Sequence, residues 1–175
     1  MGINRLNHAV LYVRDADSSA RFYEDVLGFS RVSMGGQVMP GAVFLQAPGS
    51  TNDHDLGLFS VGADAGQSAA GRGTVGLYHL AWEVDTLDDL ERLAATLSEH
   101  GALVGASDHS TTKSLYARDP DGLEFEVAWV VPADQLDEAT LAGRARIRPL
   151  DLEAAKARYG ADTPGGIGIS RTAPA

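Results

Sequence analysis

Two histidines occupy the same place in two repeats of one short pattern. Residues 6–13 read Leu-Asn-His-Ala-Val-Leu-Tyr-Val, and residues 77–84 read Leu-Tyr-His-Leu-Ala-Trp-Glu-Val. His8 and His79 each begin an apolar strand, and pseudo-twofold packing of the repeats would bring their imidazoles together. Converging neutral imidazoles bind divalent metals. Either histidine alone is more typical of a hydrogen-bonded core residue, but the pair in register favours a metal site.

A third ligand is expected from residues 119–129, Asp-Pro-Asp-Gly-Leu-Glu-Phe-Glu-Val-Ala-Trp. In a strand, Glu124 and Glu126 share one face. A carboxylate in so apolar a strand is costly unless it is paired, protonated or metal-bound. Glu126 lies deeper in the apolar run, so we favour it as a ligand over an ordinary ion-pair partner. Two histidines and one carboxylate leave three coordination positions open, as in non-haem Fe(II) oxygenases.

The elements around these residues repeat as well. Each histidine-bearing strand runs into an acidic helix start, at Asp15–Ser18 and at Asp85–Asp88, and each helix is expected to end at a glycine, Gly28 or Gly101. Three strand-like segments follow each helix. The predicted fold is therefore α+β: two βαβββ modules form one cupped, mixed β-sheet barrel with the helices outside.

The expected domain organisation follows the repeats. The main domain covers residues 1–131, with modules at about 4–61 and 75–131. Residues 132–175 break the pattern and form a C-terminal extension, with helical stretches at about 134–143 and 151–159 and a short tail.

Composition excludes several classes of function. The 175 residues include 14 Lys and Arg against 24 Asp and Glu, a formal net charge of −10, which disfavours nucleic acid and anionic membranes as partners. The chain has no cysteine, so a metal must be held by histidine, carboxylate or water. We see no apolar signal core at the N-terminus and no run near the roughly 20 residues of a membrane helix, and expect a cytoplasmic protein.

One composite pattern is more specific. Residues 108–126 contain a histidine, a tyrosine, an Asp-Pro-x-Gly turn and a strand glutamate, with Tyr116 and Glu126 ten residues apart. On these residues the chain resembles the vicinal oxygen chelate superfamily, which includes glyoxalase I and bleomycin-resistance proteins. The resemblance covers residues 4–131 and is greatest to type I extradiol dioxygenases of the catechol 2,3 type. Leu123 departs from the asparagine usual in that turn.

The resemblance implies a role for each candidate residue. His8, His79 and Glu126 would bind Fe(II), with Mn(II), Ni(II) or Zn(II) as alternatives. His54 would be an acid/base, and His109 and Tyr116 would hydrogen-bond the substrate and oxygen. The implied partners are a small aromatic diol, O₂ and a second copy of the chain. It stays open whether His8 and His79 meet within one chain or across two.

Other interpretations remain for the same residues. Taken alone, His54 and His109 are typical of polar loops and Tyr116 of a half-buried strand. A glyoxalase-type lyase or isomerase usually uses four protein ligands, two of them carboxylates, and residues 55–61 hold no mid-strand carboxylate. The third interpretation is a non-enzymatic protein that binds a small molecule, of the antibiotic-resistance kind. The presence of His8, His79 and Glu126 together makes this interpretation less favoured.

Overall fold

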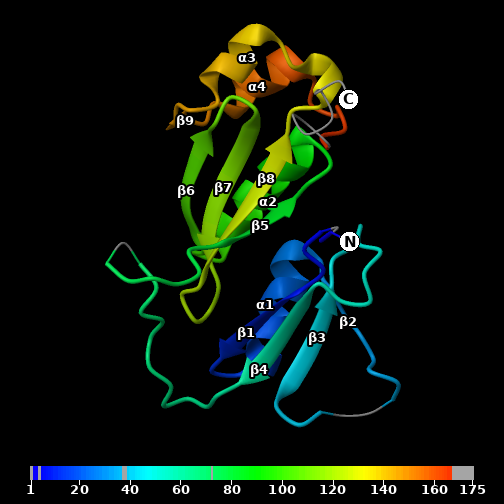
Figure 1. Ribbon diagram of the computed structural model, residues 1–175, viewed down its shortest axis with the longest axis vertical. Coiled ribbons are helices and arrows are strands. Elements are labelled where there is room, and N and C mark those ends of the chain that lie inside the picture. The colour runs from blue at the N-terminus through cyan, green and yellow to red at the C-terminus, as the bar shows by residue number, and fades with distance from the viewer. Residues whose placement is uncertain (1, 4, 37–38, 72, 167–175) are drawn as a thin grey trace. The chain divides into compact units, whose positions relative to one another are not determined.

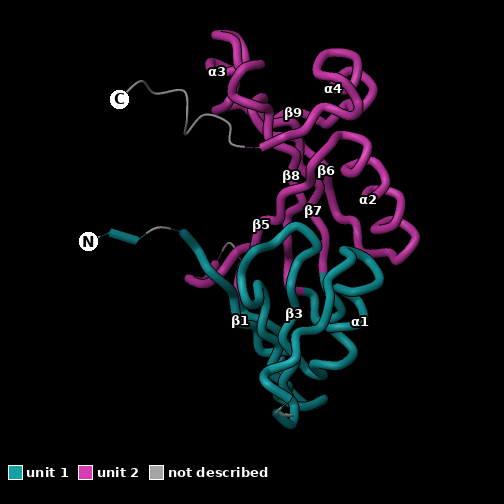
Figure 2. The backbone as a smooth tube through the Cα atoms, turned by 90° about the vertical axis from the view of Figure 1, so that its right-hand side faces the viewer, with its two compact units in different colours: residues 1–69, 119–122 teal, residues 70–118, 123–175 magenta. Residues whose placement is uncertain are grey.

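The structure is a computed structural model that describes residues 2–3, 5–36, 39–71 and 73–166 (Figure 1). The chain separates into two compact units (Figure 2). Unit 1 consists of residues 1–69 and 119–122, and unit 2 of residues 70–118 and 123–175. Each unit contains one β-sheet.

The sheet of unit 1 has four strands in the order β1-β4-β3-β2. Strands β1 and β4 are parallel, whereas β3 pairs antiparallel with both β4 and β2. The elements of this unit are β1 (Ala9–Val13), α1 (Ala16–Leu27), β2 (Ser30–Arg31), β3 (Ala42–Gln46) and β4 (Leu56–Ser60).

Helix α1 packs against β3 and β4. Leu45 and Leu58 are fully buried in this layer, and Ala20, Tyr23 and Val26 form the buried stripe of the helix. Their spacing of three residues keeps these side chains on one face of the helix. The helix begins at Asp15, whose side chain accepts from Ser18 N, and ends at Gly28 with φ 71°. Both ends lie where the sequence predicted them.

The sheet of unit 2 has five strands in the order β5-β8-β7-β6-β9. Here β5 and β8 are parallel, and the remaining neighbours are antiparallel. Helix α2 packs against β6, β7 and β8. The elements are β5 (Leu80–Glu83), α2 (Leu87–Glu99), β6 (Leu103–Asp108), β7 (Thr112–Arg118), β8 (Glu124–Val130) and β9 (Arg148–Pro149).

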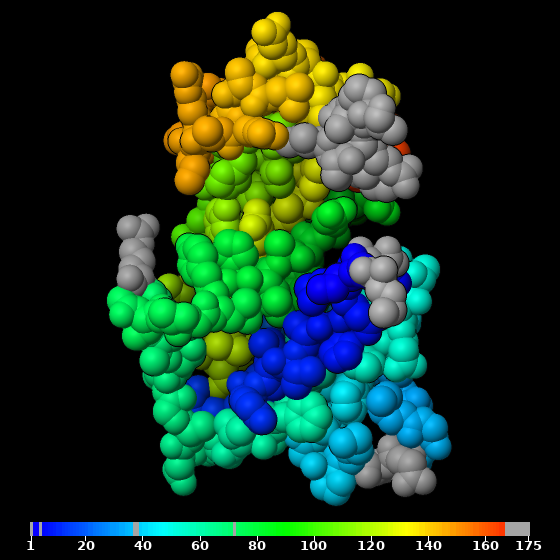
Figure 3. All heavy atoms as spheres, viewed as in Figure 1, coloured from blue at the N-terminus to red at the C-terminus, as the bar shows by residue number. Residues whose placement is uncertain are grey.

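The C-terminal extension belongs to unit 2 and adds strand β9 to the edge of its sheet. It also contains a 3₁₀ helix (Ala133–Gln135), α3 (Glu138–Gly143) and α4 (Leu152–Tyr159). Figure 3 shows these residues, yellow to orange, at the surface of this unit. The two helices match the predicted stretches, and residues 167–175 of the predicted tail lie outside the described residues.

The α+β class and the two βαβββ modules are confirmed. The strands form two separate hydrogen-bonded sheets, one in each unit, rather than one closed barrel. The reason is local: within each module the last strand pairs in parallel with the first, so each strand of a module is hydrogen-bonded to another strand of its own sheet, and β1 and β5 are edge strands. The division into a domain of residues 1–131 and an extension stays a prediction.

One short segment of the second module, residues 119–122, is part of unit 1. It is the turn between β7 and β8. Asp121 accepts from Arg14 N at 2.9 Å and forms an ion pair with the Arg14 guanidinium, while the Tyr23 hydroxyl donates to Asp119 Oδ2 at 3.3 Å. The sequence indicated a turn here but gave no sign that it would pack with the first unit.

Among the described residues, no helix is both long and apolar enough to cross a membrane.

Candidate metal and substrate site

His79 and Glu126 come together on one face of the unit 2 sheet. His79 directly precedes β5, and Glu126 is in the middle of the neighbouring strand β8, where it pairs with Ala81. His79 Nε2 lies 3.1 Å from Glu126 Oε2, and the two side chains are 25% and 14% exposed. The alternation of β8 places Phe125 and Val127 on the buried face and Glu126 on the opposite one, as the sequence predicted.

This pair fits two adjacent ligands of a divalent metal. An imidazole nitrogen and a carboxylate oxygen, each about 2.1 Å from an octahedral ion, lie about 3.0 Å apart when they are neighbours. The observed 3.1 Å also suits a hydrogen bond, so the geometry accommodates both states. Within the described part of the chain, no group of three or more His, Asp or Glu side chains is placed to hold a metal.

Tyr116 and His109 extend the cluster. Tyr116 is on β7 directly opposite Glu126, and its ring centroid is 5.8 Å from that of His79. His109 follows β6, and its Nε2 lies 2.9 Å from the Tyr116 hydroxyl. Burial, reinforced by the negative charge of Glu126, raises the pKa of Tyr116 above its usual value. Tyr116 is therefore a neutral phenol at physiological pH.

His8 and His54 lie together in unit 1. His8 precedes β1 and His54 precedes β4, and the parallel register of these strands, Ala9 opposite Leu56, brings the two imidazoles side by side. Their ring centroids are 4.5 Å apart. The sequence had aligned His8 with His79 through the repeat; it gave no sign of the His8–His54 neighbourhood, because that depends on a pairing between strands far apart in sequence.

His54 is largely enclosed, although its flanking residues are polar. Its side chain is 14% exposed, and its Nδ1 lies 2.9 Å from Asp53 Oδ2. The ring of Phe44 on β3 meets it edge to face at 5.1 Å. The structure therefore disagrees with the reading of His54 as a surface turn residue.

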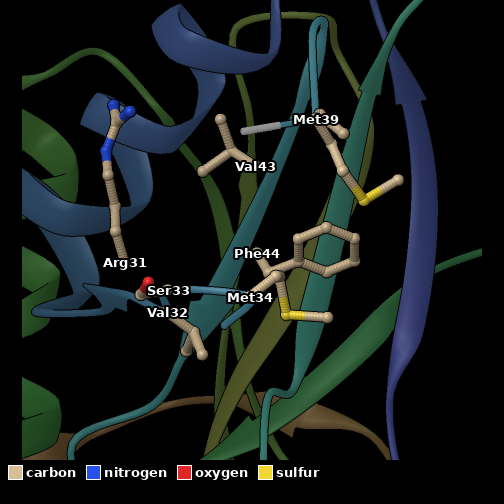
Figure 4. Close-up of a pocket in the computed structure, with 8 residues that line it drawn as sticks. Arg31, Val32, Ser33, Met34, Met39, Val43 and Phe44 are labelled. Carbon is tan, nitrogen blue, oxygen red and sulfur yellow. The ribbon is translucent and has the colours of Figure 1, made fainter. Parts of the chain in front are cut away.

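Phe44 also lines a shallow pocket of about 180 Å³ in unit 1. Figure 4 shows Met34 and Met39 lying near the Phe44 ring, while Val43 leaves the strand on the other side. The pocket is mainly apolar, apart from Arg31 and Ser33. Phe44 thus contacts His54 and also lines this pocket.

A buried carboxylate orders the loop that carries His54. Asp55 accepts from Ala47 N at 2.8 Å, from Ser50 Oγ at 2.8 Å and from Asn52 Nδ2 at 2.7 Å. Asn52 Nδ2 also donates to the carbonyl oxygen of Asn7 at 2.7 Å. Asn52 therefore ties the His54 loop to the residue before His8. Neither Asn52 nor Asp55 was predicted from the sequence. The signal for them was the run Asn52-Asp53-His54-Asp55, which is typical of side chains that bond to nearby backbone.

The candidate residues are thus divided between the units. Unit 1 holds His8 and His54, and unit 2 holds His79, Glu126, Tyr116 and His109. The parallel strand pair β1–β4 of unit 1 corresponds to the pair β5–β8 of unit 2. In each pair, a histidine directly precedes the first strand. This correspondence is the structural form of the sequence repeat.

Comparison with known families matches residues 5–127 to the glyoxalase/bleomycin resistance protein/dioxygenase superfamily. The chain belongs to this superfamily. The match spans both βαβββ modules and all the candidate residues, and it confirms the resemblance found in the sequence.

Two known proteins are similar to this chain in sequence. Catechol-2,3-dioxygenase of Bacillus subtilis (strain 168) is 28% identical over 122 residues, which are 70% of this chain and 40% of that protein. Virulence protein STM3117 of Salmonella typhimurium is 30% identical over 135 residues, which are 75% of this chain and 88% of that protein. The chain therefore spans less than half of the dioxygenase it matches.

Solved structures agree on the fold. A glyoxalase/bleomycin resistance protein/dioxygenase domain from Frankia sp. EAN1pec is 24% identical, with a TM-score of 0.59 over 73% of this chain and 92% of that one. A lactoylglutathione lyase from Agrobacterium tumefaciens is also 24% identical, with a TM-score of 0.52 over 73% and 95% of the two chains. A variant of FosX from Listeria monocytogenes, 18% identical with a TM-score of 0.52 over 72% of this chain and 90% of that one, was solved with Mn(II) and 1S,2S-dihydroxypropylphosphonic acid.

Proposed function

We propose that this protein is an Fe(II)-dependent, extradiol-type dioxygenase that cleaves a catechol-like aromatic diol with O₂. The observation that carries the proposal is the cluster on the unit 2 sheet, where His79 lies 3.1 Å from Glu126 and Tyr116 stands between that pair and His109. We assign His79 and Glu126 as two metal ligands and His8 as the third, supplied by the same chain or by its partner in a homodimer.

The metal and the chain would have separate tasks. When bound, Fe(II) would supply open positions for the diol and O₂ and carry electrons between them. Both atoms of O₂ would enter the product, and the aromatic ring of the substrate would open at the carbon–carbon bond next to the diol. Everything else in the reaction is binding and proton transfer by side chains.

Tyr116 is suited to act as a hydrogen-bond donor in that reaction. Because its pKa is raised, its hydroxyl keeps the proton at neutral pH and is available to a substrate oxygen. His109, whose Nε2 is 2.9 Å from that hydroxyl, is placed to orient it and to exchange its proton. We assign His54 to receive a proton from the diol, since a neutral imidazole has a ring nitrogen that can accept one.

Two other activities of the superfamily are less well supported. A lyase or isomerase with four protein ligands needs a second carboxylate, and strand β4, which corresponds to β8 in the repeat, reads Leu-Gly-Leu-Phe-Ser. A non-enzymatic antibiotic-binding protein has no need of a histidine and a glutamate enclosed together. Metal content and O₂ consumption distinguish these three functions.

The test begins with anaerobic purification and reconstitution with Fe(II), followed by metal analysis and O₂ uptake on a panel of catechols. We compare His79→Ala and Glu126→Gln with Glu124→Gln. Glu124 is the matched control because it is on the same strand and the same face, where it lies 3.8 Å from Arg118. We expect one Fe per chain and diol-dependent O₂ uptake in the wild type and in Glu124→Gln, and loss of both in the other two variants.

Other outcomes would overturn specific parts of the proposal. Bound metal without O₂ uptake on any diol would favour a lyase or isomerase. A wild type that takes up no metal would make His79 and Glu126 an ordinary ion pair and favour a binding protein. Full metal content in His79→Ala would refute the ligand set.

A further inference from the structure

The turn that carries His109 has a constrained backbone. It connects β6 to β7, and Ser110 within it has φ 70°, which makes it the one non-glycine residue with positive φ among the described residues. Such a conformation persists in an L-residue only where surrounding contacts enforce it. The contacts responsible should therefore also fix the neighbouring His109.

The buried side chain of Lys113 binds this turn. Lys113 is 3% exposed, and its Nζ donates to Asp108 Oδ1 at 2.7 Å and to the carbonyl oxygen of Ser110 at 2.9 Å. Asp108 Oδ1 also accepts from Ser110 N at 2.6 Å. The ring of Tyr159, from helix α4, lies 5.4 Å from the ammonium group. The residues on both sides of His109 are thus bound to one cation that α4 covers.

Helix α3 contacts the same turn through Ser110. The Ser110 hydroxyl donates to the carbonyl oxygen of Thr140 at 2.8 Å. The approach is so close that a Cβ added at Gly143 would lie 2.5 Å from Ser110 Oγ and 3.0 Å from Ser110 Cβ. Only a glycine at position 143 allows the helix and the turn to touch in this way. In Figure 1 the β6–β7 turn points towards the helices α3 and α4.

The extension is itself anchored to β8 and α2 of unit 2. Trp129 Nε1 donates to Thr163 O at 3.2 Å, and a Cβ at Gly165 would meet the Trp129 ring at 2.7 Å. Lys156 of α4 forms ion pairs with Asp88 and Glu91 of α2. The extension therefore links the His109 turn to the core of unit 2.

We infer that helices α3 and α4 act as a brace that sets the orientation of His109 towards Tyr116. Ser110, Lys113 and Gly143 are positioning residues in this account, because they hold the turn and do not contact the site. The inference rests on the proposed function for what His109 does in catalysis. The brace itself is a property of the metal-free protein and is tested there.

The experiment uses four variants of the full chain: Gly143→Ala, Ser110→Gly, their double mutant, and Gly101→Ala. Gly143→Ala inserts a methyl group where the Ser110 hydroxyl lies. Ser110→Gly removes the hydroxyl and tolerates φ 70° without strain. The double mutant removes the group with which the new methyl collides. Gly101→Ala is the matched control, because it places an alanine in the same unit at φ 64°, where only the backbone is strained, and it lies before β6, at the end of that strand opposite the turn.

The readouts in the metal-free protein are the ring ¹⁵N signals of His109 and the exchange rates of the amides of residues 109–112. For Gly143→Ala we expect shifted His109 signals and exchange at least 10-fold faster. Ser110→Gly should show a smaller change in the same direction, and the double mutant should be closer to the wild type than Gly143→Ala is. Gly101→Ala should lower the melting temperature, because an alanine is strained at φ 64°, and leave the His109 signals and exchange rates unchanged.

Activity provides an independent second readout. In the Fe(II)-loaded enzyme, we expect Gly143→Ala to lower kcat more than 10-fold with unchanged iron content. An unchanged His109 signal and exchange rate in folded Gly143→Ala, or in Ser110→Gly if the former does not fold, would overturn the brace. A wild type without O₂ uptake would overturn the proposed function instead, while the metal-free measurements would still decide on the brace.

Discussion

Glu126 illustrates how far single residues could be understood from sequence. Strand alternation predicted that it shares a face with Glu124 and opposes Phe125, and the structure has this arrangement. Its 3.1 Å approach to His79 could not be predicted, because it depends on the parallel register that puts Ala81 opposite Glu126. Whether these two groups share a metal stays a prediction.

At the same scale, Tyr116→Phe separates catalysis from metal binding. The substitution removes one hydroxyl that contacts His109 and leaves the ring in place against His79. We expect iron content to stay within error of the wild type and kcat to fall by about 10²–10³-fold, the effect of losing one well-placed donor. Metal analysis and O₂ uptake on the same preparation check this. Equal loss of iron and of turnover would make Tyr116 a structural residue.

At the scale of elements, the repeat predicted the helices and strands well but not the partners of the strands. The acidic residues at the helix starts, the glycines at the helix ends and the succession of strands along the chain all follow from local chemistry. The neighbourhood of His8 and His54 does not, because it results from pairing between β1 and β4, more than 40 residues apart. Within the network around Asp55, the donors to the carboxylate are local, and only the contact between Asn52 and Asn7 depends on that pairing.

Asn52→Ala tests whether this network orders the loop. The change removes donors to Asp55 and to the carbonyl oxygen of Asn7. We expect the free energy of unfolding to fall by about 1–3 kcal/mol, because a largely buried carboxylate loses one of its donors. Urea unfolding measures the loss. Asn7→Ala, which keeps the carbonyl acceptor and changes an exposed side chain, should stay within about 0.5 kcal/mol of the wild type.

At the scale of the whole molecule, unit 1 is assembled from two stretches of sequence. The buried hydroxyl of Tyr23 on α1 donates to Asp119 in the distant β7–β8 turn. Burial, and then the negative charge of Asp119, hold the pKa of Tyr23 well above the usual value of about 10. The sequence predicted a helix between Asp15 and Gly28 and a turn that contains Asp119, and neither prediction implies that the two elements are in contact.

This pairing predicts a specific sensitivity to alkali. The pKa of Tyr23 is higher in the folded protein than in the unfolded chain. The stability that this difference contributes is fully present below about pH 10, the pKa of an unfolded tyrosine. It is lost as the pH rises further, because the phenol ionises first in the unfolded chain. Between pH 9 and pH 11, we expect wild type to lose about 1.4 kcal/mol more stability than Tyr23→Phe. Urea unfolding at both pH values tests this. Tyr12→Phe is the control, since Tyr12 is 76% exposed and should behave like the wild type.

The turn at residues 119–122 has a consequence for how this gene could be divided. Although the two modules read as a tandem duplication, a fragment that stops at residue 69 would lack four residues of its own unit, and Arg14 and Tyr23 would lose their partners. A single split in the linker would thus yield halves that complement each other rather than halves that stand alone. The duplicated modules have become interdependent, and further shuffling in evolution should move them as a pair.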